Sequence, residues 1–110
     1  MKNNSTNNTI VDKLPANCEF VETPFYKIYR YYSTDIVQLE SENKGLMITL
    51  FTGGHYSNST RKHMIKFLAR EGINVKIQFS SIWGYKVIYY KNGREEIYNF
   101  NKEDVCQFYA

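Results

Sequence analysis

The sequence predicts an α+β domain in which one principal helix packs on a mainly antiparallel sheet. Three observations carry this expectation. Several short stretches alternate apolar and polar residues, as half-buried strands do. An Asn-Gly pair at positions 92–93 lies between two such stretches and favours a two-residue hairpin turn, because both residues tolerate positive φ. A single stretch, after Gly54, places its apolar residues at the helical period.

The domain is expected to begin near residue 18. The chain has 110 residues, of which 43% are hydrophobic and 16% aromatic, so one domain with a packed core is predicted. Residues 2–9 contain no apolar side chain that could be buried. We therefore expect residues 1–17 to form a flexible tail and residues 18–110 to form a single α+β domain.

Three strands are predicted in the first half of the domain. Residues 25–33 are aromatic and roughly alternating, and residues 34–40 contain a second short apolar run. Residues 41–45 are polar and end in glycine, which is typical of a turn. Residues 46–51 are apolar enough to occupy a central position in the sheet.

The helix is predicted from residue 57 or 59 to residue 71. Ser57 or Ser59 can cap its start by accepting a hydrogen bond from a free backbone N–H. Gly72 occupies the C-terminal capping position. The buried face is predicted from three apolar residues at helical spacing: Met64, Phe67 and Leu68.

The second half of the domain predicts a strand and a hairpin. Residues 73–79 alternate as a half-buried strand does. Pairing outward from the Asn-Gly turn opposes Tyr89 with Glu96, Val87 with Tyr98 and Tyr85 with Phe100. The apolar members of these pairs then share one face, which is expected to face the core. Residues 101–109 are predicted to form a short helical turn.

Charge is concentrated in the middle of the chain. Residues 43–94 carry nine Lys and Arg against Glu71 alone, a net charge of +8, whereas residues 1–42 carry −2 and residues 95–110 carry −3. On the helix, Lys62, Lys66 and Arg70 recur every fourth residue and share a face, with Arg61 at its start.

This basic face has two interpretations. It is either a nucleic-acid or nucleoprotein surface, or a solvated helix face balanced by acidic flanks folded against it. In the first case, nearby aromatic residues could stack on bases: Tyr56, Trp83, Tyr85, Tyr89 and Tyr90. Trp83 could equally be a core anchor or an exposed interface residue.

The glycine-containing segment before the helix is a candidate anion-binding loop. Residues 52–62 run from strand through loop to helix start, a geometry that can present backbone N–H groups to anions, but they match neither phosphate-loop nor dinucleotide-binding spacing. The alternative is a tight strand-to-helix connection. His55 and His63 flank several hydroxyl groups, yet no acidic residue lies nearby to orient either ring. We therefore expect no catalytic site, no metal site and no cofactor.

The expected compartment is the cytoplasm. No stretch approaches the roughly 20 apolar residues that cross a bilayer, and the N-terminus lacks the apolar core of a signal peptide, so no membrane partner is expected. Cys18 and Cys106 are then expected to be reduced thiols.

Two stretches resemble small uncharacterised proteins of bacteriophages and related mobile elements. Residues 31–37 (Tyr-Tyr-Ser-Thr-Asp-Ile-Val) look like an aromatic-Ser/Tyr-x-Thr-x-Val strand of those proteins. Residues 56–63 (Tyr-Ser-Asn-Ser-Thr-Arg-Lys-His) look like their Tyr-Ser-x-Thr-Thr-x-Lys/Arg-His helix start. The resemblance spans roughly residues 29–71 and implies a viral or mobile-element origin, hence a host cytoplasm, but it carries no known activity.

The function expected from these observations is non-enzymatic binding. The first hypothesis is a phage-type accessory or anti-defence (anti-CRISPR-like) inhibitor that engages a host protein or nucleoprotein complex. The second is direct binding of DNA or RNA by the 61–70 helix face, and the third is a small enzyme working at His55, Ser57 and His63. Whether the chain forms a homodimer is left open. The residues expected to contact the partner are Arg61, Lys62, Lys66, Arg70, Tyr56, His55 and Trp83.

Overall fold

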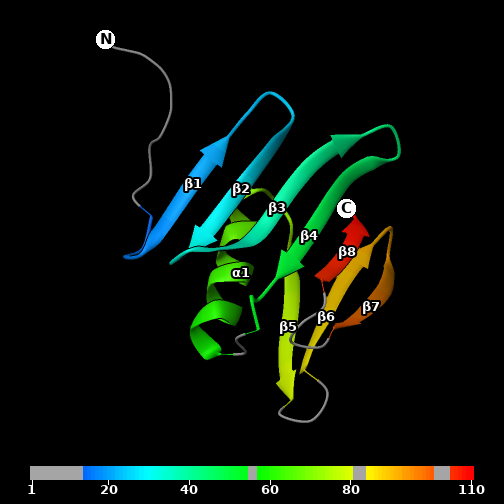
Figure 1. Cartoon of the computed structure of the whole chain (residues 1–110). Coiled ribbons are helices and arrows are strands. Elements are labelled where there is room, and N and C mark those ends of the chain that lie inside the picture. The colour runs from blue at the N-terminus through cyan, green and yellow to red at the C-terminus, as the bar shows by residue number, and fades with distance from the viewer. Residues whose placement is uncertain (1–13, 55–56, 81–83, 101–104) are drawn as a thin grey trace.

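The computed structural model describes residues 14–54, 57–80, 84–100 and 105–110. In these residues the chain forms one helix and two antiparallel sheets, so the predicted α+β class is confirmed (Figure 1). No helix in this part of the chain is long and apolar enough to cross a membrane.

The larger sheet has five strands in the order β1-β2-β3-β4-β8. Its strands are β1 (Cys18–Glu22), β2 (Tyr26–Tyr31), β3 (Thr34–Glu42), β4 (Gly45–Phe51) and β8 (Val105–Tyr109). The strands predicted at residues 25–33, 34–40 and 46–51 are confirmed to within two residues at each end. As expected, β4 is an interior strand, because β3 and β8 pair with its two edges.

The helical turn predicted at residues 101–109 is wrong where the structure describes it. Residues 105–109 form strand β8, while residues 101–104 lie outside the described residues. Cys106 and Phe108 alternate with exposed residues, and both are buried beside Leu50 and Ile48 of β4. This period of two fits a strand that pairs with β4, a partner far upstream in the sequence.

The smaller sheet has three strands in the order β5-β6-β7. Its strands are β5 (Val75–Ser80), β6 (Gly84–Lys91) and β7 (Arg94–Phe100). The predicted register is confirmed, since Tyr85 pairs with Phe100, Val87 with Tyr98 and Tyr89 with Glu96. Both residues of the Asn-Gly turn have positive φ, +53° and +76°, as the predicted type of turn requires.

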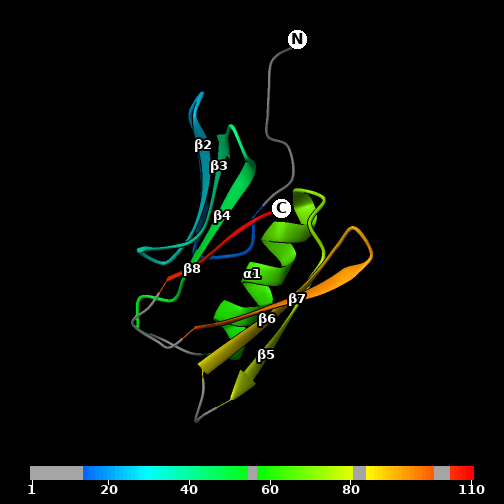
Figure 2. The same ribbon diagram turned by 90° about the vertical axis from the view of Figure 1, so that its right-hand side faces the viewer.

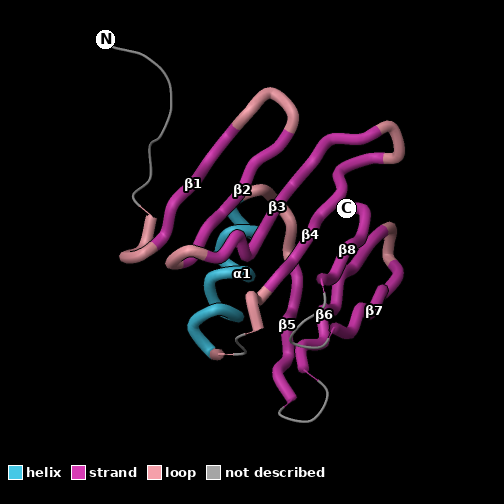
Figure 3. The backbone as a smooth tube through the Cα atoms, viewed as in Figure 1, coloured by secondary structure: helices cyan, strands magenta, loops and turns pink. Residues whose placement is uncertain are grey.

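Helix α1 (Asn58–Arg70) lies between the two sheets, as Figure 2 shows. The helix buries Met64, Phe67 and Leu68, as predicted, in a core that both sheets share. The ring of Phe67 stacks on that of Tyr29 of β2 with centroids 4.5 Å apart. Strand β8 lies next to β7, which brings the two sheets together on the side away from the helix (Figure 3). Only one side of α1 is therefore left open.

Candidate binding surface

The start of α1 is held by its own cap and by the smaller sheet. Ser57 has extended backbone angles, and its side-chain oxygen accepts a hydrogen bond from the N–H of Thr60 at 3.1 Å. Ser57 is thus the N-cap, one of the two residues predicted for that role. The buried hydroxyl of Tyr85 accepts from the Ser57 N–H at 3.2 Å and donates to the Ser57 carbonyl at 2.7 Å. This clamp positions the residues that follow.

Lys62, Lys66 and Arg70 are exposed along the open side of α1, and we call these three residues the basic row. The three ion pairs within the described residues are made by Lys27 and Arg30, so neither Lys62 nor Lys66 has a carboxylate partner there. The acidic residues of the flanks that the structure describes therefore do not neutralise these two lysines by direct contact. Arg70 lies at the end of the row, with its guanidinium carbon 6.0 Å from the centre of the Tyr29 ring.

Other predicted contact residues have structural roles. Arg61 is half-buried and donates to the carbonyl of Ile77 at 3.1 Å, which ties α1 to β5. Tyr85 is only 1% exposed, so the prediction that it could stack on a base is wrong.

Of the other aromatic residues proposed to stack on bases, Tyr89 packs on Phe108, while Tyr90 is 54% exposed. The remaining predicted contact residues lie outside the described residues: His55, Tyr56 and Trp83.

His63 is engaged in packing. Its Nδ1 lies 2.6 Å from the carbonyl oxygen of Ser59, and because a carbonyl can only accept, Nδ1 carries a proton. The ring stacks on Tyr31 with centroids 4.4 Å apart and an angle of 22° between the planes. The Ser57 hydroxyl is directed to Thr60. The structure thus does not bring Ser57 and His63 together as the nucleophile and base of an enzyme.

A cavity of about 390 Å³ lies beside the start of α1. We call it the hydroxyl cavity, because eight of the described residues that line it carry a hydroxyl group and none is charged. Residues of the β2–β3 turn and of the first turn of α1 both line it, so the two stretches that carry the phage resemblance meet here. The lining residues are Tyr31, Tyr32, Ser33, Thr34, Ile36, Thr52, Ser57, Ser59 and Thr60.

Tyr32 is the residue of this cavity that sequence reasoning missed. It is 63% exposed and has a φ of +56°, a left-handed conformation that costs a bulky residue about 1–2 kcal/mol. Asn17 holds it in place, because the Tyr32 N–H donates to the Asn17 carbonyl at 2.7 Å and the Asn17 amide donates to the Tyr32 hydroxyl at 3.2 Å. Tyr32-Ser33 lacks the glycine or asparagine that marks such turns, so no sequence signal could have located it.

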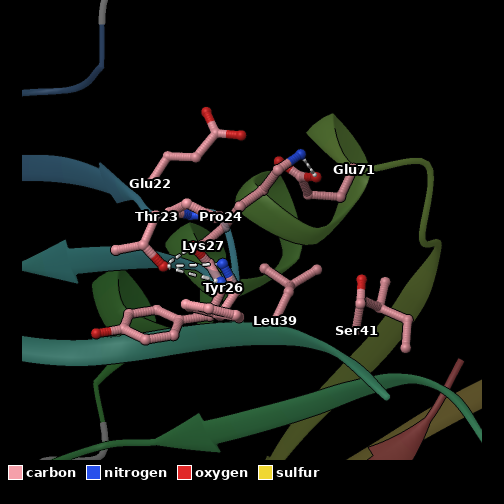
Figure 4. A pocket seen from close by; sticks show the side chains of 10 residues that line it. Glu22, Thr23, Pro24, Tyr26, Lys27, Leu39, Ser41 and Glu71 are labelled. Atoms are coloured by element: carbon pink, nitrogen blue, oxygen red, sulfur yellow. Dashed lines mark hydrogen bonds and ion pairs between the residues drawn. The ribbon is translucent and has the colours of Figure 1, made fainter. Parts of the chain in front are cut away.

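A second cavity, of about 190 Å³, lies at the other end of α1 (Figure 4). The Glu71 carboxylate accepts from Lys27 at 2.9 Å and from the Tyr29 hydroxyl at 2.6 Å. Burial, and then the bond to Glu71, raises the pKa of Tyr29 to about 12; the same carboxylate raises the pKa of Lys27. The Lys27 ammonium and the Tyr29 hydroxyl thus satisfy the Glu71 carboxylate, and these bonds fasten the end of α1 to β2.

The cysteines offer no reactive centre. Both thiols are free, and Cys106 is buried. Burial raises the pKa of the Cys106 thiol to about 11 and also raises that of Cys18, against a smaller opposing effect of Lys66. A thiol with a raised pKa is a poor nucleophile at neutral pH. In the described ranges, no three His, Cys, Asp or Glu side chains gather as metal ligands.

No protein family, curated protein or solved structure matches this chain. Two adjoining features of the fold are candidates for a functional role: the basic row and the hydroxyl cavity.

Proposed function

We propose that this protein is a non-enzymatic binding protein that docks single-stranded nucleic acid on the basic row of α1. The observation that carries the proposal is the exposure of Lys62 and Lys66 on one helix face without a carboxylate partner among the described residues. Lysines that neutralise phosphates release condensed counterions, which drives binding at low salt without regard to base sequence.

The position of α1 favours a single strand over a duplex. A recognition helix enters the major groove as a projecting element. Helix α1 is instead flanked by a sheet on each side (Figure 2), and its exposed lysines, Lys62 and Lys66, lie on one face. A flexible strand can follow such a face, because its backbone is not confined to a rigid groove. Lys62 and Lys66 are one helical turn apart, about 6 Å along the axis, so they can meet successive parts of one backbone.

The resemblance to bacteriophage proteins supplies a setting for this binding. A host nucleoprotein complex exposes single strands while it works, and an accessory or anti-defence protein could engage it through such a strand. This extension uses the same surface as the direct binding of nucleic acid. It differs in requiring a complex rather than the strand alone.

The test is fluorescence anisotropy of labelled DNA and RNA strands of about 12 nucleotides, at about 50 and 200 mM salt. The double variant Lys62→Glu/Lys66→Glu should bind more weakly, with the slope of log K against log salt reduced by about 1.4, or 0.7 for each phosphate contact. Each single variant, Lys62→Glu or Lys66→Glu, is compared with the matched control Lys44→Glu, which makes the same single charge reversal in the exposed β3–β4 turn, far from the start of α1 (Figure 1).

Three results would contradict the proposal. The first is the absence of binding to any strand at low salt. The second is an equal loss of affinity in the Lys44→Glu control, because the effect would then reflect net charge alone. The third is salt-sensitive binding to polyglutamate but not to nucleic acid, which would assign the row to an acidic protein partner.

A further inference from the structure

We infer that the hydroxyl cavity receives one base of the bound strand, with the ring of Tyr32 as its stacking platform. The inference rests on the proposed function, because it takes the strand on the basic row as the source of the base. It adds a base-recognition site to a surface that otherwise meets phosphates alone.

The cavity and the basic row are continuous along α1. Ser59 lines the cavity, and Lys62 and Lys66 follow it at three and seven residues. Residues at this spacing share one face of a helix. A strand whose backbone lies on Lys62 and Lys66 therefore reaches the cavity with its next nucleotide.

The chemistry of the lining suits a neutral, polar, flat ligand. Among the described residues, the side-chain hydroxyls of Ser33, Thr34 and Ser59 make no hydrogen bond. A hydroxyl both donates and accepts, so three of them can match the polar edge of a base without a fixed pattern. No lining residue among those described is charged, so the cavity has no cationic side chain there to attract a phosphate.

Aromatic rings lead from the rim of the cavity toward the basic row. The Tyr32 ring is largely exposed and lies 4.8 Å from that of Tyr31, which in turn stacks on His63 of α1. Base–aromatic stacking tolerates any base sequence, because every base has a π-face. Packing of Tyr31 on the helix keeps this platform rigid, so little freedom is lost when a base stacks on it.

The experiment compares an ordinary single strand with an abasic strand of the same length and charge, both labelled. The native protein should bind the ordinary strand about 5- to 100-fold more tightly. Tyr32→Gly should bring this ratio close to one while the abasic strand keeps its affinity and its salt dependence. Glycine adopts the positive φ of this turn without strain, so the variant keeps the fold. Tyr32→Phe keeps the ring and should keep the ratio.

The control is Tyr90→Ala, which removes another exposed tyrosine, on β6. It should leave both strands unaffected, and a loss of the ratio in this variant would place the base on the smaller sheet and overturn the inference. A ratio near one in the native protein, or a ratio that survives Tyr32→Gly, would also overturn it while leaving phosphate docking intact. No binding of the abasic strand at low salt would instead contradict the proposed function.

Discussion

Replacing Tyr85 by phenylalanine removes the hydroxyl through which β6 clamps Ser57 at the start of α1. That hydroxyl bonds to both backbone groups of Ser57, at 3.2 Å to the nitrogen and 2.7 Å to the carbonyl oxygen. The Tyr85 ring is 1% exposed and packs against Phe79 and Phe100, contacts that phenylalanine retains. The substitution therefore tests the clamp with little change in packing.

The two lost bonds differ in cost. The Ser57 carbonyl keeps a partner, because the N–H of Arg61 donates to it at 3.1 Å. The Ser57 N–H loses its bond to Tyr85, and an unsatisfied buried donor costs about 1–3 kcal/mol. Ser57 itself is exposed, so water can reach part of this site. We expect the free energy of unfolding to fall by about 1–2 kcal/mol, the lower part of that range.

Urea unfolding followed by circular dichroism measures this loss. The matched control is Tyr109→Phe, which removes a hydroxyl that donates to exposed Glu42 at 2.6 Å and should change stability by less than about 0.5 kcal/mol. If Tyr85→Phe costs no more than this control, the hydroxyl does not hold the helix start. The reasoning that links the smaller sheet to the binding surface would then be refuted.

Two further predictions concern the ends of α1. Tyr29 has a pKa raised from 10.0 to about 12, so its bond to Glu71 stabilises the fold fully below pH 10 and is lost as the pH rises through 12. Tyr29→Phe should cost about 2 kcal/mol in urea unfolding below pH 10, and a gap that persists above pH 12 would contradict the assignment. Gly53→Ala places a Cβ at a φ of +68° and 3.0 Å from Thr34, so it should cost more than Gly93→Ala, which has a φ of +76° and open space. Equal losses of unfolding free energy would show that a Cβ at position 53 does not clash with Thr34, which lines the hydroxyl cavity.

Local patterns in the sequence predicted the parts of the fold that depend on near neighbours. The hairpin around Asn92 and Gly93 has its predicted register, because turn chemistry and alternation act within a few residues. The face of α1 that holds Met64, Phe67 and Leu68 follows from helical spacing alone. The same spacing predicted that Lys62 and Lys66 would share the exposed side.

Contacts between residues far apart in the sequence determined the parts of the fold that local patterns did not predict. Residues 105–109 join β4 as a strand, because the edge of β4 and the core beneath it offer Cys106 and Phe108 a buried position. Tertiary packing likewise turned Arg61 toward the carbonyl of Ile77. The burial of Tyr85, by contrast, agrees with the alternation that placed it on the core-facing side of its strand.

The candidate site divides in the same way between sequence and tertiary structure. Composition and helical period predicted the basic row, because residues four apart in the sequence lie on the same face of a helix. The hydroxyl cavity exists only because the β2–β3 turn and the start of α1, which are separated in the sequence, meet in the fold. The left-handed conformation of Tyr32 depends on its bonds to Asn17 across β1 and β2 rather than on turn propensity. Contacts between distant segments therefore form the cavity, whereas local helical periodicity places Lys62 and Lys66 on the helix face next to it.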